Sequence, residues 1–170
     1  MIEILMILLG LIFSYFLKDI NFLSLQFSFL NSEIIYPDFL ILFLIFFSLR
    51  SSEVLGIWIG FFAGLLEDST ILKFSKTEFH PLLGMHTLVY PIVGYILSKF
   101  KRFLDINNTG VAIFVTFIAA FSTRTFVWLL MGIMDNFYQS YSILATSLYT
   151  SLLAPVWFLL LKWTYYKKEL

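Results

Sequence analysis

The residues of this sequence that could do chemistry are few, and most of them are carboxylates or stand beside one arginine. Arg124 lies in the polar tetrad Ser122-Thr123-Arg124-Thr125, which interrupts a long apolar segment. Asp38, Glu67 and Asp68 are the acidic side chains that could meet it. An arginine with carboxylates and threonine hydroxyls around it could bind an acidic or zwitterionic solute, or it could form an ion pair that only holds helices together.

Two histidines complete this set, and neither indicates a catalyst. His80 and His86 have no third ligand at metal spacing, so we expect no metal site and expect His86 to be a hydrogen-bonded interior residue or an interfacial one. The sequence has no nucleophile elbow, no histidine and carboxylate motif of an intramembrane protease, and no phosphate loop. We therefore expect no cofactor and no enzymatic activity.

The composition places these polar residues in a lipid bilayer. Hydrophobic residues make up 60% of the 170 residues, 21 residues are phenylalanine and only 13% are charged, which excludes an ordinary soluble domain. The formal net charge is zero and cysteine is absent, so nucleic-acid binding and thiol chemistry are not expected. We predict an all-α integral membrane protein with a single transmembrane domain over residues 1–170.

The apolar segments that must position the polar residues predict a six-helix transmembrane bundle. The expected spans lie at about 4–17, 34–49, 54–66, 82–97, 111–134 and 143–161. One helix over 34–66 would be too long for the hydrocarbon core, so we expect a tight hairpin of two short helices. Residues 23–29 alternate apolar and polar side chains, which indicates a strand or an interfacial segment. Pro91 and Pro155 fall inside spans and should kink them.

The basic residues predict the orientation, because short cytoplasmic loops carry the excess of lysine and arginine. With six spans, one side receives Lys18, Lys73 and Lys76, and the other receives Arg50, Lys99, Lys101, Arg102, Lys162, Lys167 and Lys168. Both termini are therefore predicted to face the cytoplasm. Arg124 then lies about 20 Å along the fifth span, in the outer half of the bilayer.

An arginine at this depth is costly against lipid, so it should point into the bundle and meet an acceptor. The sequence does not choose between Asp38, Glu67 and Asp68 as that acceptor. The sixth span begins with a polar face at a matching depth, since its threonines are four residues apart. We predict a polar cluster in the outer half of the bundle, formed by Asp38, Glu67, Asp68, Arg124, Thr146 and Thr150.

A stripe of small residues marks the third span. Glycine recurs at every fourth position in GIWIGFFAGLLED, at Gly56, Gly60 and Gly64. Helices associate in lipid through close backbone approach and polar contacts, so this stripe predicts a groove that receives another helix, either from the same bundle or from a partner protein. Glu67 and Asp68 are expected at the outer C-terminal end of this helix, where they oppose its macrodipole.

The order of three motifs resembles the rod shape-determining protein MreD family. These motifs are Pro37-Asp38-Phe39-Leu40, then GxxxGFxxGLxxD over residues 56–68, then Leu83-Gly84-Met85-His86-x-Leu88 leading to Val93-Gly94-Tyr95. Two features depart from the family pattern. The predicted loop at residues 69–81 is longer and more charged than the family's short turn, and Glu67 adds a second carboxylate beside Asp68.

This resemblance implies a fold similar to the substrate-binding subunits of energy-coupling-factor vitamin transporters. It also implies a non-enzymatic scaffold in the bacterial cytoplasmic (inner) membrane, which works with the membrane-anchored MreC, with MreB, and with the glycosyltransferase and transpeptidase of peptidoglycan elongation. The alternative is a small-molecule-binding subunit of a transporter, with the polar cluster as its ligand pocket. The first span weighs against that alternative, because it is bulky rather than alanine-rich.

Overall fold

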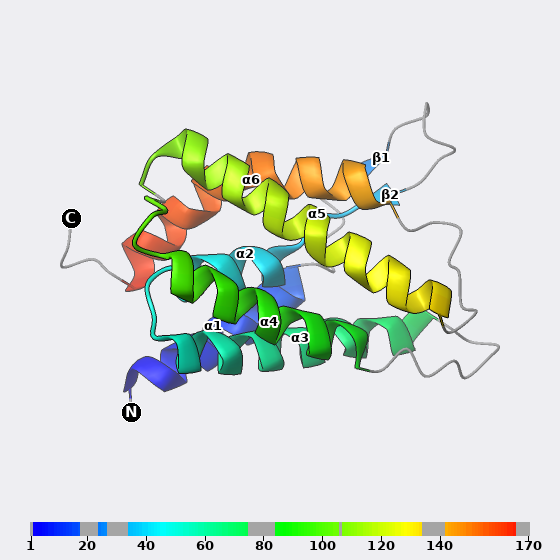
Figure 1. The fold of residues 1–170 in the computed structure, drawn as a ribbon, viewed down its shortest axis with the longest axis horizontal. Helices are drawn as coiled ribbons and strands as arrows, with labels where there is room; N and C mark the ends of the chain where they lie inside the picture. Colours follow the sequence, from blue (N-terminus) through cyan, green and yellow to red (C-terminus); the bar gives the residue numbers. More distant parts are fainter. Residues whose placement is uncertain are drawn as a thin grey trace.

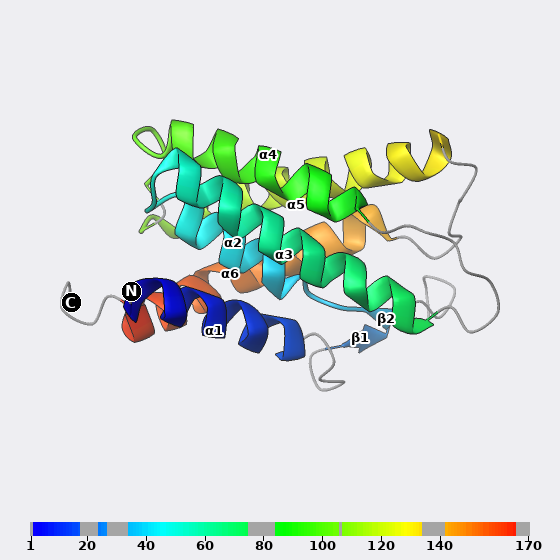
Figure 2. The same cartoon turned by 90° about the horizontal axis from the view of Figure 1, so that it is seen from below.

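The computed structural model describes residues 2–17, 24–26, 34–74, 84–105, 107–133 and 142–165. Six helices lie in these residues, namely α1 (Ile2–Leu17), α2 (Phe39–Ser48), α3 (Glu53–Phe74), α4 (Met85–Phe100), α5 (Thr109–Ile133) and α6 (Ile143–Tyr165). They run roughly along one axis and form an elongated bundle, with the start of α1 and the end of α6 at the same end (Figures 1 and 2). The prediction of six helices is confirmed for this part of the chain.

The innermost element is α2, whose ten residues are all buried. It contacts the five other helices and lies in the middle of the bundle (Figure 2). A helix of this length covers about 15 Å, which is half of a hydrocarbon core. Every side chain of α2 therefore packs against protein, and none is left to face lipid.

The backbone that leads into α2 is extended rather than helical, which corrects the predicted helix over 34–49. Strand β2 (Ile34–Ile35) pairs antiparallel with β1 (Leu25–Gln26), so a strand does lie within the alternating segment 23–29. Pro37 explains the late start of the helix, because proline disfavours helical backbone in the residue before it. Pro37 and Asp38 are buried, and non-helical backbone is tolerated at membrane depth only where protein covers it.

Helix α3 is longer than predicted, because it continues to Phe74 instead of ending near Leu66. Glu67 and Asp68 consequently lie inside the helix and not at its C-terminal end. Both are buried, so the last residue of the apolar run did not mark the end of the helix. The predicted loop at 69–81 begins as helix, and its residues 75–81 lie outside the described part of the chain.

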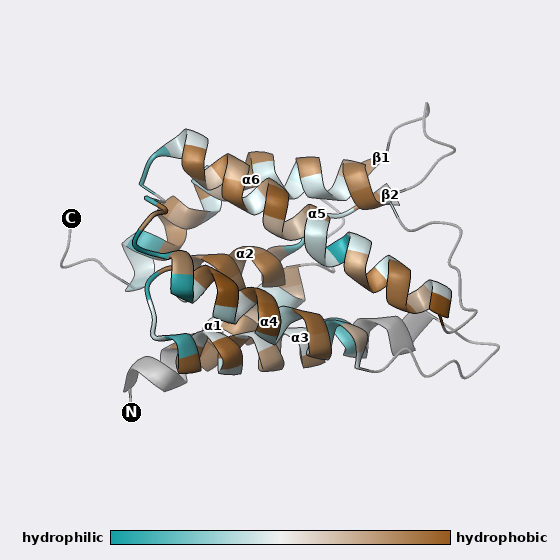
Figure 3. Cartoon of the chain, viewed as in Figure 1, coloured by the Kyte–Doolittle hydropathy of each residue, from teal (hydrophilic) through white to brown (hydrophobic). Residues whose placement is uncertain are grey.

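Two helices of the described residues, α5 and α6, are long and apolar enough to cross a membrane by themselves. Pro91 lies inside α4 and Pro155 inside α6, and both helices continue past their prolines. Hydrophobic residues cover most of the length of the helices, while hydrophilic residues gather in the connections at the end that holds the start of α1 (Figure 3). This distribution is the one expected of a bundle embedded in lipid.

Candidate functional site

The glycine stripe, which consists of Gly56, Gly60 and Gly64, lies directly against α4. A Cβ atom on Gly60 would stand 2.5 Å from the carbonyl oxygen of Tyr90, and one on Gly64 would stand 2.5 Å from that of His86. These neighbours are backbone atoms, which cannot rotate out of the way. The glycines therefore allow α3 and α4 to pack backbone against backbone, as small residues do between membrane helices.

Helix α4 also contributes a glycine, Gly94, to its contact with α3. A Cβ on Gly56 would meet the carbonyl oxygen of Gly94 at 2.8 Å, and Gly94 in turn lies against the carbonyl group of Gly56. One turn after Gly94 on α4, the Ser98 hydroxyl donates to the carbonyl oxygen of Ser48 at the end of α2. The groove is thus filled by α4 of the same chain, which corrects the alternative in which a partner's helix occupies it.

Asp38 caps the N-terminus of α2 in the interior of the bundle. One carboxylate oxygen accepts a hydrogen bond from the backbone N–H of Ile41 at 3.0 Å, and the other accepts from the Tyr90 hydroxyl at 3.0 Å. The backbone N–H of Asp38 donates to the Thr150 hydroxyl of α6 at 3.0 Å. This one residue therefore ties α2 to α4 and α6.

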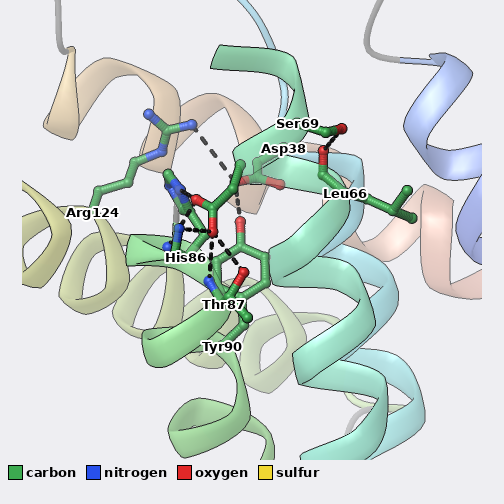
Figure 4. A network of polar contacts seen from close by, with 9 residues as sticks. Asp38, Leu66, Ser69, His86, Thr87, Tyr90 and Arg124 are labelled. Atoms are coloured by element: carbon green, nitrogen blue, oxygen red, sulfur yellow. Dashed lines mark hydrogen bonds and ion pairs between the residues drawn. The ribbon is translucent and has the colours of Figure 1, made fainter. Parts of the chain in front are cut away.

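Arg124 brings α5 to the same point. One terminal nitrogen of its guanidinium lies 3.6 Å from the Asp38 oxygen that Tyr90 also contacts (Figure 4). The Asp38 side chain is 5% exposed and that of Arg124 is 15% exposed. Of the three carboxylates considered as acceptors for Arg124, Asp38 thus forms an ion pair with it. The negative charge also lies at the N-terminal end of α2, where the helix dipole favours it.

Asp68 does for α4 what Asp38 does for α2, although it belongs to a different helix. Its oxygens accept from the backbone N–H groups of Gly84, His86 and Thr87, each at 3.0 Å, and from the Thr87 hydroxyl at 2.6 Å. The residue at the N-cap position of α4 is Gly84, with φ at 108° and no side chain to cap the helix. Asp68 supplies from α3 the acceptor that this position lacks.

His86 connects the two carboxylates. Its Nδ1 lies 2.9 Å from Asp68, and its ring packs edge-on against the ring of Tyr90, with centroids 5.5 Å apart (Figure 4). Tyr90 in turn donates to Asp38. The carboxylate of Asp38, at the N-cap of α2, and that of Asp68, in α3, thus both contact side chains of α4. His86 is an interior hydrogen-bonded residue, one of its two predicted roles, while His80 lies outside the described part of the chain.

The remaining members of the predicted cluster are buried close by. Thr146 lies one turn before Thr150 on α6 and is 5% exposed, and Glu67 precedes Asp68 and is also 5% exposed. Ser69, one residue after Asp68, donates back to the carbonyl oxygen of Leu66 (Figure 4). In the described residues no group of three histidine or acidic side chains could hold a metal ion.

Sequence reasoning missed three participants, namely Gly84, Thr87 and Tyr90. A signal for the first two was present, because Gly84, near the start of the fourth apolar segment, has no side chain that could cap a helix. Such a helix start needs an acceptor from elsewhere, and Asp68 was an available carboxylate. Nothing local indicated Tyr90, whose hydroxyl reaches a residue 52 positions away in the sequence.

This geometry defines a class of protein: an apolar helical bundle with two described helices that are long enough to span a membrane, in which buried carboxylates hold helix ends. The chain belongs to the MreD family, since it matches the rod shape-determining protein MreD over residues 1–167. The members of this family are non-enzymatic shape-determining membrane proteins. No curated protein and no solved structure was found to match the chain.

Proposed function

We propose that this protein is a scaffold of the bacterial cell-elongation (rod) complex, which docks an MreC-like membrane-anchored protein and helps to position the synthases of peptidoglycan. This proposal rests on one observation: the buried carboxylates are already occupied by contacts within the protein. Asp38 and Asp68 direct their oxygens to helix N-termini, to Tyr90 and Thr87, and to Arg124. A solute-binding site would need such groups to be available to the solute.

This arrangement favours the scaffold over the small-molecule-binding subunit of a transporter. A solute that took Arg124 would compete with Asp38, and one that took the Asp68 oxygens would uncap α4. The predicted likeness to energy-coupling-factor subunits stays a prediction, because no solved structure matches. The family membership supports a role in rod shape, and MreB, the glycosyltransferase and the transpeptidase belong to this proposal as members of the same complex.

The orientation proposed for the scaffold has both termini in the cytoplasm. In the structure the start of α1 and the end of α6 share one end of the bundle with the connections that follow α2 and α4 (Figure 1). This end carries most of the basic residues of the described chain, including Arg50, Lys101, Arg102 and Lys162. The positive-inside rule favours the cytoplasm for such an end.

The docking face of the scaffold should be sought on the outside of the bundle, because α4 fills the glycine stripe. Large apolar side chains point outward from several helices, for example Trp58 on α3 at 55% exposure, Phe114 on α5 at 64% and Leu152 on α6 at 65%. A membrane-anchored partner would lay its helix against one of these faces. The other faces would then contact lipid.

Photo-crosslinking in the membrane tests this proposal. A photoreactive residue is placed in turn at Trp58, Phe114 and Leu152, and a co-expressed MreC is probed for crosslinks after irradiation. Phe43 on α2 serves as the interior position, because this aromatic side chain is fully buried. We expect crosslinks to MreC from one outer face and none from position 43. No crosslink from any outer face of a correctly inserted protein would overturn MreC docking.

A further inference from the structure

A pocket of about 330 Å³ opens at the end of the bundle that holds the start of α5 and the end of α6. Its polar wall contains Arg50, which follows α2, and Lys162, which lies in the last turn of α6. Asn107 and Thr109 add an amide and a hydroxyl from the start of α5. None of these four residues belongs to the Asp38 or Asp68 groups, so the pocket is separate from the polar interior.

The polar wall is positive. It contains two cations, and among the described residues that line the pocket none is acidic. The nearest carboxylate in the sequence, Asp105, does not line the pocket and accepts two hydrogen bonds from Asn107. The guanidinium of Arg50 lies 4.1 Å above the ring of Phe46, and this contact helps to hold it in place. Paired cations with additional donors suit a phosphate group.

The rest of the pocket lining is apolar, and most of it comes from α6 on the N-terminal side of Lys162. Phe158 lies one turn and Pro155 about two turns before Lys162, which places them about 6 and 10 Å deeper along α6. Leu159 and Trp163 flank them and are 68% and 59% exposed. Tryptophan is typical of the interface between headgroups and hydrocarbon. A ligand in this pocket would thus meet cations at one end and an apolar, lipid-exposed surface at the other.

We propose that this pocket binds an anionic phospholipid, with Arg50 and Lys162 contacting its phosphate and with an acyl chain lying along Leu159 and Phe158. Basic pockets between membrane helices recognise the headgroups of anionic lipids in this way. The chemistry that distinguishes a lipid from free phosphate is the apolar wall, which inorganic phosphate would not use. The inference depends neither on the rod-complex function nor on which side of the membrane this end faces.

Native mass spectrometry of the detergent-purified full chain tests this inference. The protein is titrated with phosphatidylglycerol or with phosphatidylcholine of the same acyl chains, and the bound lipid is counted. We expect preferential retention of phosphatidylglycerol. Each cation should contribute on the order of a fivefold preference, so Lys162→Gln should lower the preference about fivefold and the double variant with Arg50→Gln should remove it.

The matched control is Lys99→Gln, because Lys99 is an exposed lysine at the end of α4 that does not line the pocket. It should leave the preference unchanged. An equal loss in Lys99→Gln, or an unchanged preference in a Lys162→Gln protein with a wild-type unfolding temperature, would overturn the site. Displacement of phosphatidylglycerol by millimolar inorganic phosphate would also overturn it, since the pocket would then bind phosphate without using its apolar wall.

Discussion

Asp38 and Asp68 are two buried carboxylates at the N-termini of two helices, and they reach those helices in different ways. Asp38 precedes α2 in the sequence and caps its own helix through the N–H of Ile41. Asp68 belongs to α3 and caps α4, whose N–H groups are 16 to 19 residues further along the chain. A guanidinium stands 3.6 Å from Asp38, whereas the partners of Asp68 are backbone groups, the Thr87 hydroxyl and His86.

The difference shows what each carboxylate can hold together. The hydrogen bond by which Asp38 caps α2 is local. Asp38 connects α2 to the rest of the bundle through Tyr90, Thr150 and Arg124, which lie on three other helices. The cap of α4 is itself the tertiary contact, because it joins α3 to α4. It depends on the short distance between these two helices that the glycine stripe allows. A charge pair therefore fastens α5 to the centre, while helix capping fastens α4.

Asp38→Ala should have the largest effect, because it removes the cap of α2 and leaves the Arg124 cation in the interior without this carboxylate. Removing one partner of a buried ion pair costs about 3–5 kcal/mol. The measurement is the free energy of unfolding in mixed detergent micelles. Asp105→Ala is the matched control, since this aspartate lies exposed in the connection before α5, and it should unfold like the wild type.

A double-variant cycle sharpens the comparison by isolating the charge pair. Asp38→Asn and Arg124→Gln should each lower the free energy of unfolding. The loss in the double variant should be smaller than the sum of the two single losses by about 1–3 kcal/mol. The same cycle with Asp68→Asn in place of Asp38→Asn should give a coupling near zero. Coupling of equal size in both cycles would mean that the two carboxylates are not held in different ways.

Gly60→Leu should weaken the cap that Asp68 provides to α4, because it disturbs the packing of α3 against α4. The new side chain meets the backbone of Tyr90, so α3 and α4 must separate at a cost of about 1–3 kcal/mol. Phe61→Leu, at an exposed position next to it, is the control. Hydrogen exchange at the amides of Gly84 and Thr87 should rise in Gly60→Leu alone, because Asp68 moves away with α3.

Asp68→Asn should have the smallest effect, a loss of about 1–2 kcal/mol. The amide oxygen can still accept from N–H groups at the start of α4, whereas the amide nitrogen that replaces the other carboxylate oxygen cannot accept. Asp68→Ala should cost more, since it removes every acceptor. This order differs from that at position 38, where asparagine also leaves the Arg124 charge without its ion pair. If Asp68→Asn and Asp38→Asn had equal unfolding free energies, the proposed role of the charge at Asp38 would be wrong.

The composition of the sequence and the position of each polar residue along its apolar segment predicted much of this architecture. Apolar segments predicted six helices, and the distance along each helix put Arg124 at the level of Asp38 and Thr150. The ends of the elements could not be read in this way. Helix α3 passes through Glu67 and Asp68 because the fold buries both residues, and α2 starts after Pro37 because extended backbone is covered by neighbours that are distant in the sequence.

The pairing of Asp68 was beyond the sequence for a related reason. A carboxylate that caps another helix leaves no local pattern, since its partners are backbone N–H groups and any residue type can provide them. The glycine stripe predicted a helix contact, but not whether the contacting helix came from the same chain. Only the register between α3 and α4, with Gly56 opposite Gly94, answers that question.

The most direct test of the central claim is the co-purification of MreC with the charge-free variant Asp38→Asn/Arg124→Gln, compared with the wild type at equal amounts of folded protein. If these residues hold the bundle together and a scaffold surface does the docking, the variant should retain MreC at the wild-type ratio. A folded variant that no longer retains MreC would contradict the account, because the buried charges would then take part in the function itself.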